Sequence, residues 1–232
     1  MSKKFQVIVS DPPWSFTDSL TMSDVARGAA ANYVTMTNED ILNLNVQAIA
    51  DPDGCVLALW VPSSILQTGL DVMKAWGFEH KQTYVWVKVK KEPLVLLKKS
   101  IKKFMKVSSK QKLTMNDYLE GFQQCLRSFD IRDVLSFFMG RLFRQTHEIC
   151  LIGLNNTKVY KQLANKSQRS VSFGQNLDHS AKPEHLQDSL EIMFPNSEKF
   201  EMFARRIRSD WTCVGNEVCN GEDIRDSLKK LI

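Results

Sequence analysis

The stretch FQVIVSDPPW, residues 5–14, decides the fold because a short apolar run stops abruptly at two prolines. Residues 5–9 are apolar and rich in β-branched side chains, which indicates a buried strand. Proline cannot donate a hydrogen bond within a central sheet, so the chain must leave the sheet at Asp11-Pro12-Pro13. The tip of such a strand is where open α/β sheets bind their ligands.

Further apolar runs alternate with helical stretches along the rest of the chain. Additional strands are predicted over five ranges, namely 55–61, 83–89, 148–154, 199–204 and 211–214. Helices are predicted over Val34–Leu44, with Thr37 as the N-cap, and over Ser64–Trp76 and His185–Met193. This alternation predicts an α/β fold with a mainly parallel sheet and helices on both faces.

Residues 91–139 interrupt the alternation, because they are too many for a simple crossover. We expect a helical insertion within a single domain that covers residues 1–232. Its first part is rich in lysine without balancing acids, and Lys98, Lys102 and Lys103 fall near helical spacing. Such lysines suit contact with nucleic-acid phosphates, while the alternatives are a solvated surface or a disordered loop.

The second part of this insertion is predicted to hold two helices, Asn116–Phe129 and Ile131–Phe138. Their apolar side chains need burial, either on the body of the domain or in an interface with a second copy. We favour a homodimer through residues 91–139, since the core fold is complete without them.

The composition is ordinary for a globular protein and sets broad limits. The 232 residues carry a net charge of +5 and include five cysteines with no Cys-x-x-Cys pair. We therefore expect a reducing compartment and no metal site. No apolar run is long enough for a transmembrane helix, so we expect no membrane partner and a cytoplasmic protein, from a bacterial or phage-infected cell or, if eukaryotic, from the nucleus.

The turn Asp11-Pro12-Pro13-Trp14 carries groups that suit an adenine amine. This amine is a weak nucleophile, because its lone pair is delocalised into the ring. The Asp11 carboxylate and the Pro12 carbonyl can accept hydrogen bonds from both amino hydrogens, and the prolines fix the backbone that presents them. Trp14 offers a face for stacking the base. The alternative is an ordinary turn that ends a strand.

An ordered series of motifs resembles the adenine-amino methyltransferases of the Asp-Pro-Pro-Trp type. This family contains the catalytic subunit of the eukaryotic mRNA adenosine methyltransferase and bacterial and phage DNA methyltransferases. The resemblance covers about residues 5–90 and 140–218. Its motifs are Asp11-Pro12-Pro13-Trp14, Tyr33-Val34-Thr35-Met36-Thr37, Leu59-Trp60-Val61, Val85-Trp86-Val87-Lys88, Arg144 with His147-Glu148, Lys182-Pro183, Glu201-Met202-Phe203-Ala204-Arg205, and Trp211 with Gly215-Asn216-Glu217.

The resemblance implies a circularly permuted, Rossmann-like class I methyltransferase fold and S-adenosyl-L-methionine as methyl donor. Asp11, Pro12, Pro13 and Trp14 would form the reaction centre. Three aromatic residues would line the adenine pocket, although two of them could equally be core residues: Tyr33, and the strand residues Trp60 and Trp86. The residues expected to bind the donor are Asp11, Lys182, Glu201, Phe203, Arg205, Asn216 and Glu217.

The resemblance predicts N6-methylation of adenine in a nucleic acid, with DNA favoured over RNA. A small chain without zinc fingers or an RNA-binding module is closer to the bacterial and phage DNA enzymes. One alternative is an RNA adenosine methyltransferase. A second is a catalytically inactive member that acts as a nucleic-acid-binding partner subunit, and the intact Asp-Pro-Pro-Trp turn argues against it. A third is an amino methyltransferase acting on cytosine or on a free metabolite.

Overall fold

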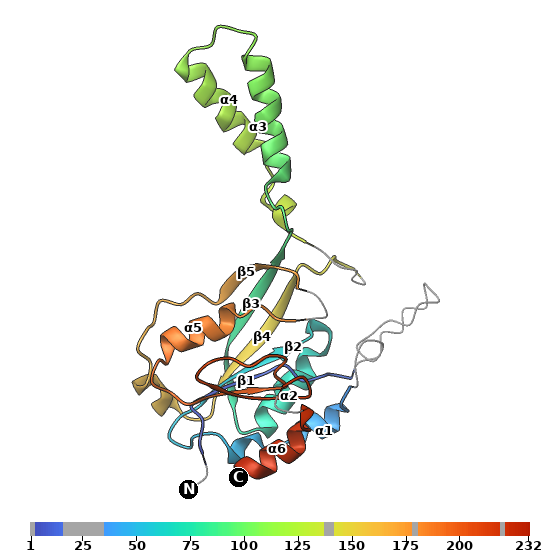
Figure 1. The fold of residues 1–232 in the computed structure, drawn as a ribbon, viewed down its shortest axis with the longest axis vertical. Coiled ribbons are helices and arrows are strands. Elements are labelled where there is room, and N and C mark those ends of the chain that lie inside the picture. The colour runs from blue at the N-terminus through green and yellow to red at the C-terminus, as the bar shows by residue number, and fades with distance from the viewer. Residues whose placement is uncertain (1–2, 16–34, 137–141, 178–180, 219–220) are drawn as a thin grey trace, which may run out of the picture. The chain divides into compact units, whose positions relative to one another are not determined.

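The computed structural model describes residues 3–15, 35–136, 142–177, 181–218 and 221–232 (Figure 1). Its strands are β1 (Val7–Ser10), β2 (Val56–Val61), β3 (Glu79–Val89), β4 (His147–Leu154), β5 (Val171–Gln175), β6 (Lys199–Met202) and β7 (Trp211–Val214). Its α-helices are α1 (Asn38–Leu42), α2 (Leu66–Ala75), α3 (Val95–Ser108), α4 (Met115–Arg127), α5 (His185–Met193) and α6 (Ile224–Leu231). Short 3-10 turns lie at Val46–Ala48, Ser63–Ile65, Ile131–Val134 and Thr157–Lys161.

The strands form one seven-stranded sheet in the order β5-β3-β4-β2-β1-β6-β7. β1 pairs in parallel with β2 and β6, and β6 pairs in parallel with β7, whereas β4 runs antiparallel to β2. The predicted α/β class with a mainly parallel sheet is thereby confirmed. β1 lies between β2, which follows it in the chain, and β6, which comes much later. Asp11 therefore leaves the sheet at a topological switch point.

Each face of the sheet packs against its own layer of the protein, because successive residues of a strand point to opposite faces. Leu57 and Leu59 of β2 belong to a core cluster that also holds residues of α1, α2 and α6. Trp60 is equally buried but points to the other face. Figure 1 shows α1, α2 and α6 together and α5 apart from them. The two layers explain why all six residues of β2 are buried.

Two compact units divide the chain, and they are described separately. The first unit comprises residues 1–85, 148–172 and 178–232, and the second comprises residues 86–147 and 173–177. The second unit is dominated by the antiparallel pair α3 and α4. The pair is closely packed at Gly121, where an added Cβ would lie 2.1 Å from the Phe104 ring. Phe104 also meets Tyr118 and Phe122 edge to face.

Several helices and strands differ from those predicted from the sequence. The helix expected over Ile131–Phe138 is only a 3-10 turn at Ile131–Val134, after which Leu135 pairs with Val89 as in a strand. Phe137 and Phe138 lie outside the described residues. The helix expected from Val34 begins at Asn38, with Thr37 as N-cap as predicted. The sequence did not predict β5 or α6.

Two further results concern the whole described part of the chain. Within residues 3–15, 35–136, 142–177, 181–218 and 221–232, none of the helices combines the length and apolar character needed to cross a membrane. The same residues contain no group of three or more His, Cys, Asp or Glu side chains placed to share a metal ion.

Candidate active site at the end of the first strand

The turn after β1 is closed by its own backbone. The Trp14 N–H donates to the Pro12 carbonyl at 2.8 Å, and the Met36 N–H donates to the Pro13 carbonyl at 3.0 Å. The two prolines fix φ in this turn, so its shape does not depend on a ligand. The Pro12 carbonyl was expected to accept a hydrogen bond from an adenine amine. It has a second lone pair for that purpose, since Trp14 occupies only one.

Trp14 differs from the expectation. Its side chain is 2% exposed and belongs to the core cluster. Its indole N–H donates to the Trp60 carbonyl at 2.9 Å. Burial of a large apolar ring with its one polar atom satisfied is favourable, so the ring anchors the turn to the core. In this arrangement Trp14 presents no free face for stacking a base, which corrects the predicted stacking role.

Asp11 projects from this turn into a group of three charged side chains. The Lys182 Nζ lies 2.8 Å from Asp11 Oδ2 and 3.2 Å from Glu148 Oε2. The same ammonium lies 5.6 Å from the centre of the Trp60 ring, within cation–π range. The Asp11 side chain is 27% exposed, so a ligand can reach it. We call Asp11, Lys182 and Glu148 the charged triad.

Burial and pairing act in opposite directions within the charged triad. Burial raises the pKa of Asp11 above its ordinary value, although the nearby ammonium of Lys182 lowers part of that shift. Burial alone would lower the pKa of Lys182, but the charges of Asp11 and Glu148 outweigh it and raise that pKa. Lys182 therefore stays protonated at neutral pH. Two carboxylate groups thus lie beside one ammonium in the triad.

Glu148 is a site residue that the sequence argument named only within a motif and gave no role. It lies near the start of β4, and β4 is antiparallel to β2. The first residues of β4 therefore lie at the same edge of the sheet as the last residues of β2, beside Trp60 and Val61. The sequence signal that could have identified Glu148 is a charged residue at the start of an apolar strand. The direction of that strand could not be read from the sequence.

The remaining aromatic and basic candidates are distributed as follows. Trp60 is 2% exposed and contacts Tyr84 edge to face, so it is a core residue whose ring also meets Lys182. Trp86 is buried in the second unit, where its indole N–H donates to the Gly174 carbonyl. Tyr33 lies outside the described residues. Lys98, Lys102 and Lys103 are exposed on α3, in the second unit.

The other residues predicted to bind the donor lie in β6 or in the segments after β6 and β7, all in the first unit. Glu201 of β6 is opposite Val9 of β1 and accepts a hydrogen bond from Gln187 at 3.1 Å. Burial raises the pKa of Glu201, and the hydrogen bond from Gln187 offsets part of that shift. Phe203 ends β6 with a φ of 59°, a left-handed conformation that is uncommon for a residue with a side chain.

The loop after β7 lies close to the end of β6. A Cβ on Gly215 would lie 2.4 Å from the Ala204 carbonyl oxygen, so only glycine allows this approach. The contact places Asn216 and Glu217 near Arg205, whose Nε lies 3.5 Å from Glu217 Oε1. The sequence argument left Glu201 or a donor carboxylate as partners for Arg205, and the structure pairs it with Glu217. Asn216 and Glu217 are both exposed, as ligand-binding residues must be.

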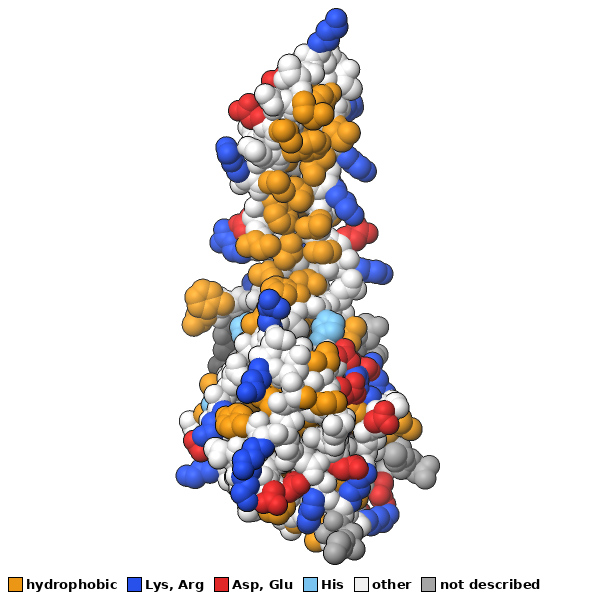
Figure 2. Space-filling view, turned by 90° about the vertical axis from the view of Figure 1, so that its left-hand side faces the viewer, with side chains coloured by type: hydrophobic (Ala, Val, Ile, Leu, Met, Phe, Trp, Pro, Cys, Tyr) orange, Lys and Arg blue, Asp and Glu red, His pale blue; other side chains and the backbone are white. Residues whose placement is uncertain are grey.

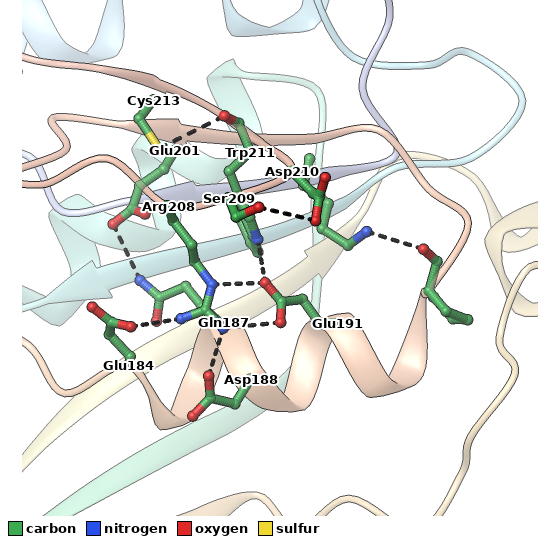
Figure 3. A network of polar contacts seen from close by, with 12 residues as sticks. Glu184, Gln187, Asp188, Glu191, Glu201, Arg208, Ser209, Asp210, Trp211 and Cys213 are labelled. Atoms are coloured by element: carbon green, nitrogen blue, oxygen red, sulfur yellow. Dashed lines mark hydrogen bonds and ion pairs between the residues drawn. The ribbon is translucent and has the colours of Figure 1, made fainter. Parts of the chain in front are cut away.

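A network of ion pairs joins the segment after β6 to α5 (Figure 3). The guanidinium of Arg208 contacts Glu184, Asp188 and Glu191 at 2.8, 2.5 and 2.7 Å. The Trp211 indole N–H donates to the same Glu191 at 2.7 Å. This network was not predicted, because its members are spread over 28 positions, from 184 to 211, in two elements and a loop.

The chain matches the MT-A70 family model over residues 5–117 and 130–217. It is 24% identical over 219 residues to an N(6)-adenosine-methyltransferase MT-A70-like protein of Drosophila melanogaster, covering 93% of this chain and 27% of the relative. It is 22% identical over 218 residues to the human N(6)-adenosine-methyltransferase catalytic subunit METTL3, covering 93% and 28%.

A third relative is similar in length. The type II methyltransferase M.MunI of Mycoplasma sp. is 25% identical over 231 residues, covering 93% of this chain and 78% of the relative. By contrast, this chain spans only about a quarter of the length of the MT-A70-like relatives. The family match also takes in residues 91–117 and 130–139 of the predicted insertion, which the motif series left unexplained. Because the match covers the turn after β1 and the strands and loops that carry the donor-site candidates, the chain belongs to the MT-A70 family.

Proposed function

We propose that this protein transfers a methyl group from S-adenosyl-L-methionine to the N6 amine of adenine in a nucleic acid, with DNA favoured over RNA. The observation that carries the proposal is the Asp11 carboxylate, held at the switch point of the sheet with Lys182 and Glu148 and still accessible. The names of the MT-A70-like relatives support the choice of amine. The match to the type II methyltransferase, which extends over 78% of that relative, supports DNA over RNA.

The residues present fit the proposed donor. The Asp11 carboxylate of the charged triad suits a sulfonium cation, and Glu217 and Asn216 suit hydrogen bonds with the two hydroxyls of a ribose. We propose that Lys182 also contacts the carboxylate of the donor's amino-acid part. Gln187 Oε1 and Ser10 Oγ are buried without a hydrogen-bond partner among the described residues, beside Glu201 and Asp11 respectively. Unsatisfied polar atoms at these places are consistent with a site built for a polar ligand.

When bound, the donor supplies an electrophilic methyl carbon on sulfur. Asp11 accepts a hydrogen bond from one amino hydrogen of adenine, and the Pro12 carbonyl accepts from the other. The amine then becomes more nucleophilic while it is held in line with the methyl group. As the N–C bond forms and the S–C bond breaks, the amine gains positive charge, which the Asp11 carboxylate stabilises. The methylated amine then gives up one proton to solvent, and N6-methyladenine and S-adenosylhomocysteine are released.

The proposed activity is tested by incubating the purified chain with methyl-labelled donor and a panel of duplex DNA, single-stranded DNA and RNA. Nucleosides are then separated by mass spectrometry. We expect N6-methyladenine in DNA. Label in cytosine would favour the cytosine alternative, and label only in RNA would favour the RNA alternative. Donor binding without transfer to any of these substrates would indicate an inactive partner subunit.

We further propose that the lysine face of α3 contacts the nucleic-acid backbone. Lys98, Lys102 and Lys103 are exposed, and α3 carries five lysines and no acidic residue. Replacing these three with glutamine should weaken binding to all sequences equally and reduce the slope of log affinity against log salt by about 3, at roughly one per phosphate contact. Fluorescence anisotropy at several salt concentrations measures both effects.

A matched control removes the same charge elsewhere. Lys81, Lys158 and Lys229 are surface lysines paired with Glu79, Asp53 and Asp226, and their replacement by glutamine also lowers the net charge by three. If this triple variant loses as much affinity and slope as the α3 variant, the lysine face has no special role.

We also propose that the hairpin α3–α4 pairs with a second copy of this chain. An apolar stripe runs along the hairpin, flanked by charged residues (Figure 2). Its most exposed members are more than half exposed: Met105, Val107, Met115, Leu119 and Leu126. A two-helix hairpin can bury such a stripe only against further helices, and a second hairpin would complete a four-helix bundle.

The charges favour a second copy in one orientation. α3 carries lysines only, whereas α4 carries Asp117 and Glu120 and a single arginine, Arg127. Placing α3 of one copy beside α4 of the other brings opposite charges together, while α3 against α3 would be repulsive. The homodimer is therefore self-complementary.

Leu119→Glu is expected to shift the protein from dimer to monomer, because a carboxylate would be placed in the apolar interface. Light scattering coupled to gel filtration measures the mass. Gln124→Glu is the matched control, since it adds the same charge to the same helix on a different face. A monomeric wild-type protein at micromolar concentration, or equal effects of the two substitutions, would contradict the dimer.

A further inference from the structure

The residue that joins the two halves of the proposed donor site is Arg206. It follows Arg205 directly, and the two side chains have different partners. Arg205 contacts Glu217 in the loop after β7. Arg206 donates from its NH2 to the Lys182 carbonyl at 3.0 Å. Two consecutive residues after β6 thus contact the proposed ribose-binding loop and the segment that carries Lys182.

Glu184 reinforces the second contact. It lies two residues after Lys182, at the N-cap of α5. One oxygen of its carboxylate lies 2.7 Å from Arg206 Nε, and the other lies 2.8 Å from Arg208 NH1. Arg208 is 15% exposed and is fixed in turn by Asp188 and Glu191 of α5. A largely covered guanidinium with three carboxylate partners is a rigid support.

Local backbone geometry leaves Lys182 dependent on this support. Lys182 precedes Pro183, and residues 181–184 lie outside any helix or strand. The Lys182 carbonyl and the carboxylate of its neighbour Glu184 both bind Arg206, so Arg206 helps to fix the Lys182 main chain.

We propose that Arg206 is a positioning residue, which fixes the Lys182 main chain so that the ammonium can meet the amino-acid part of the methyl donor. Arg206 itself is about half exposed. It would act through Lys182, while Arg205 and Glu217 act on the ribose. This inference rests on the proposed function, because it assumes that Lys182 meets the donor's carboxylate.

The test compares two ligands that differ only in the part that Lys182 would contact. S-adenosylhomocysteine carries the amino-acid tail, and 5′-methylthioadenosine has the same adenine, ribose and sulfur without it. Calorimetry measures the binding of each to the unmodified chain and its variants. We expect Arg206→Ala to weaken the binding of S-adenosylhomocysteine about 5- to 20-fold. This corresponds to the loss of one or two charge-assisted hydrogen bonds. Binding of 5′-methylthioadenosine should change less than about twofold.

Three further variants make the result specific. Glu217→Gln should weaken both ligands, because both contain the ribose. Arg206→Lys keeps the charge beside Glu184 and should restore part of the affinity for S-adenosylhomocysteine. Arg225→Ala is the matched control: Arg225 is also about half exposed and also paired with one carboxylate, Asp223. The Arg225→Ala variant should bind both ligands like the wild type. Its melting temperature should fall by a similar amount to that of Arg206→Ala.

The outcomes separate the inference from the proposed function. If the wild type binds neither ligand, the proposed donor is wrong. If the wild type binds both and Arg206→Ala binds S-adenosylhomocysteine equally well, or loses both ligands equally, the positioning role is wrong while the donor assignment remains. In steady-state kinetics the variant should raise the donor KM and leave kcat at saturating donor within about threefold.

Discussion

Asp11→Ala is expected to reduce methyl transfer by about a thousandfold or more while the protein remains folded. The carboxylate is the proposed acceptor for an amino hydrogen and the charge that stabilises the amine in the transition state, and groups of this kind are worth about 10²–10⁴-fold. The fold should survive, because Lys182 retains Glu148 at 3.2 Å and no ammonium is left unpaired. Single-turnover kinetics with bound donor measure the chemical step, and thermal unfolding checks the fold.

A matched control for Asp11→Ala is Asp53→Ala. Asp53 is also an aspartate in an ion pair with a lysine, Lys158, at 2.8 Å. It precedes β2, at the opposite end of the parallel strands from Asp11. The control should keep its activity. Transfer by Asp11→Ala within about tenfold of the wild type would remove Asp11 from the reaction centre.

Lys182→Met should be the most destabilising substitution in the charged triad. It leaves two largely buried carboxylates, Asp11 and Glu148, without the ammonium between them. Removing one partner of a buried ion pair typically costs about 3–5 kcal/mol of unfolding free energy. Chemical denaturation measures this loss. The double variant Glu148→Gln with Lys182→Met should recover part of it, because one stranded carboxylate is gone.

The instability of Lys182→Met should depend on pH in one direction. The ammonium lowers the pKa of Asp11, so its removal raises that pKa further above the ordinary 3.8. A carboxyl group with a raised folded-state pKa favours folding below its unfolded pKa and loses that contribution as pH rises through the folded value. The difference in unfolding free energy between the variant and the wild type should therefore be small near pH 3.8 and grow toward neutral pH. A gap that is constant over this range would mean that the triad carboxylates are not the cause.

The strands and the turn after β1 could be predicted because their signals are local. β7 and α5 have the predicted bounds, and β1, β2, β4 and β6 differ from them by a few residues at their ends. Asp11 could be placed where open α/β sheets bind their ligands. The reason is that the two prolines after it end a buried strand at this position. Lys182 could be placed near it only through the family resemblance, since nothing between positions 11 and 182 indicates that they meet.

The errors have physical causes. The residues after Val134 pair with the end of β3 instead of continuing a helix, because the backbone there offers them hydrogen-bond partners. β5 is short and alternates exposed and half-buried side chains, so it has no apolar signature. Trp14 was expected to be accessible because it ends a functional motif. Burying this large apolar ring is more favourable than exposing it to water. The Trp60 carbonyl accepts the hydrogen bond from its N–H. The circular permutation of the fold stays a prediction.

The anchoring of Trp14 has a consequence for how this protein fails when heated. Loops that carry reacting groups are commonly the first parts of an enzyme to loosen, and activity then fades before the fold melts. Here the turn after β1, which carries the proposed reacting group, cannot loosen unless the Trp14 indole leaves the interior and breaks its hydrogen bond to β2. The shape of the turn and the integrity of the surrounding body are thus lost in the same event.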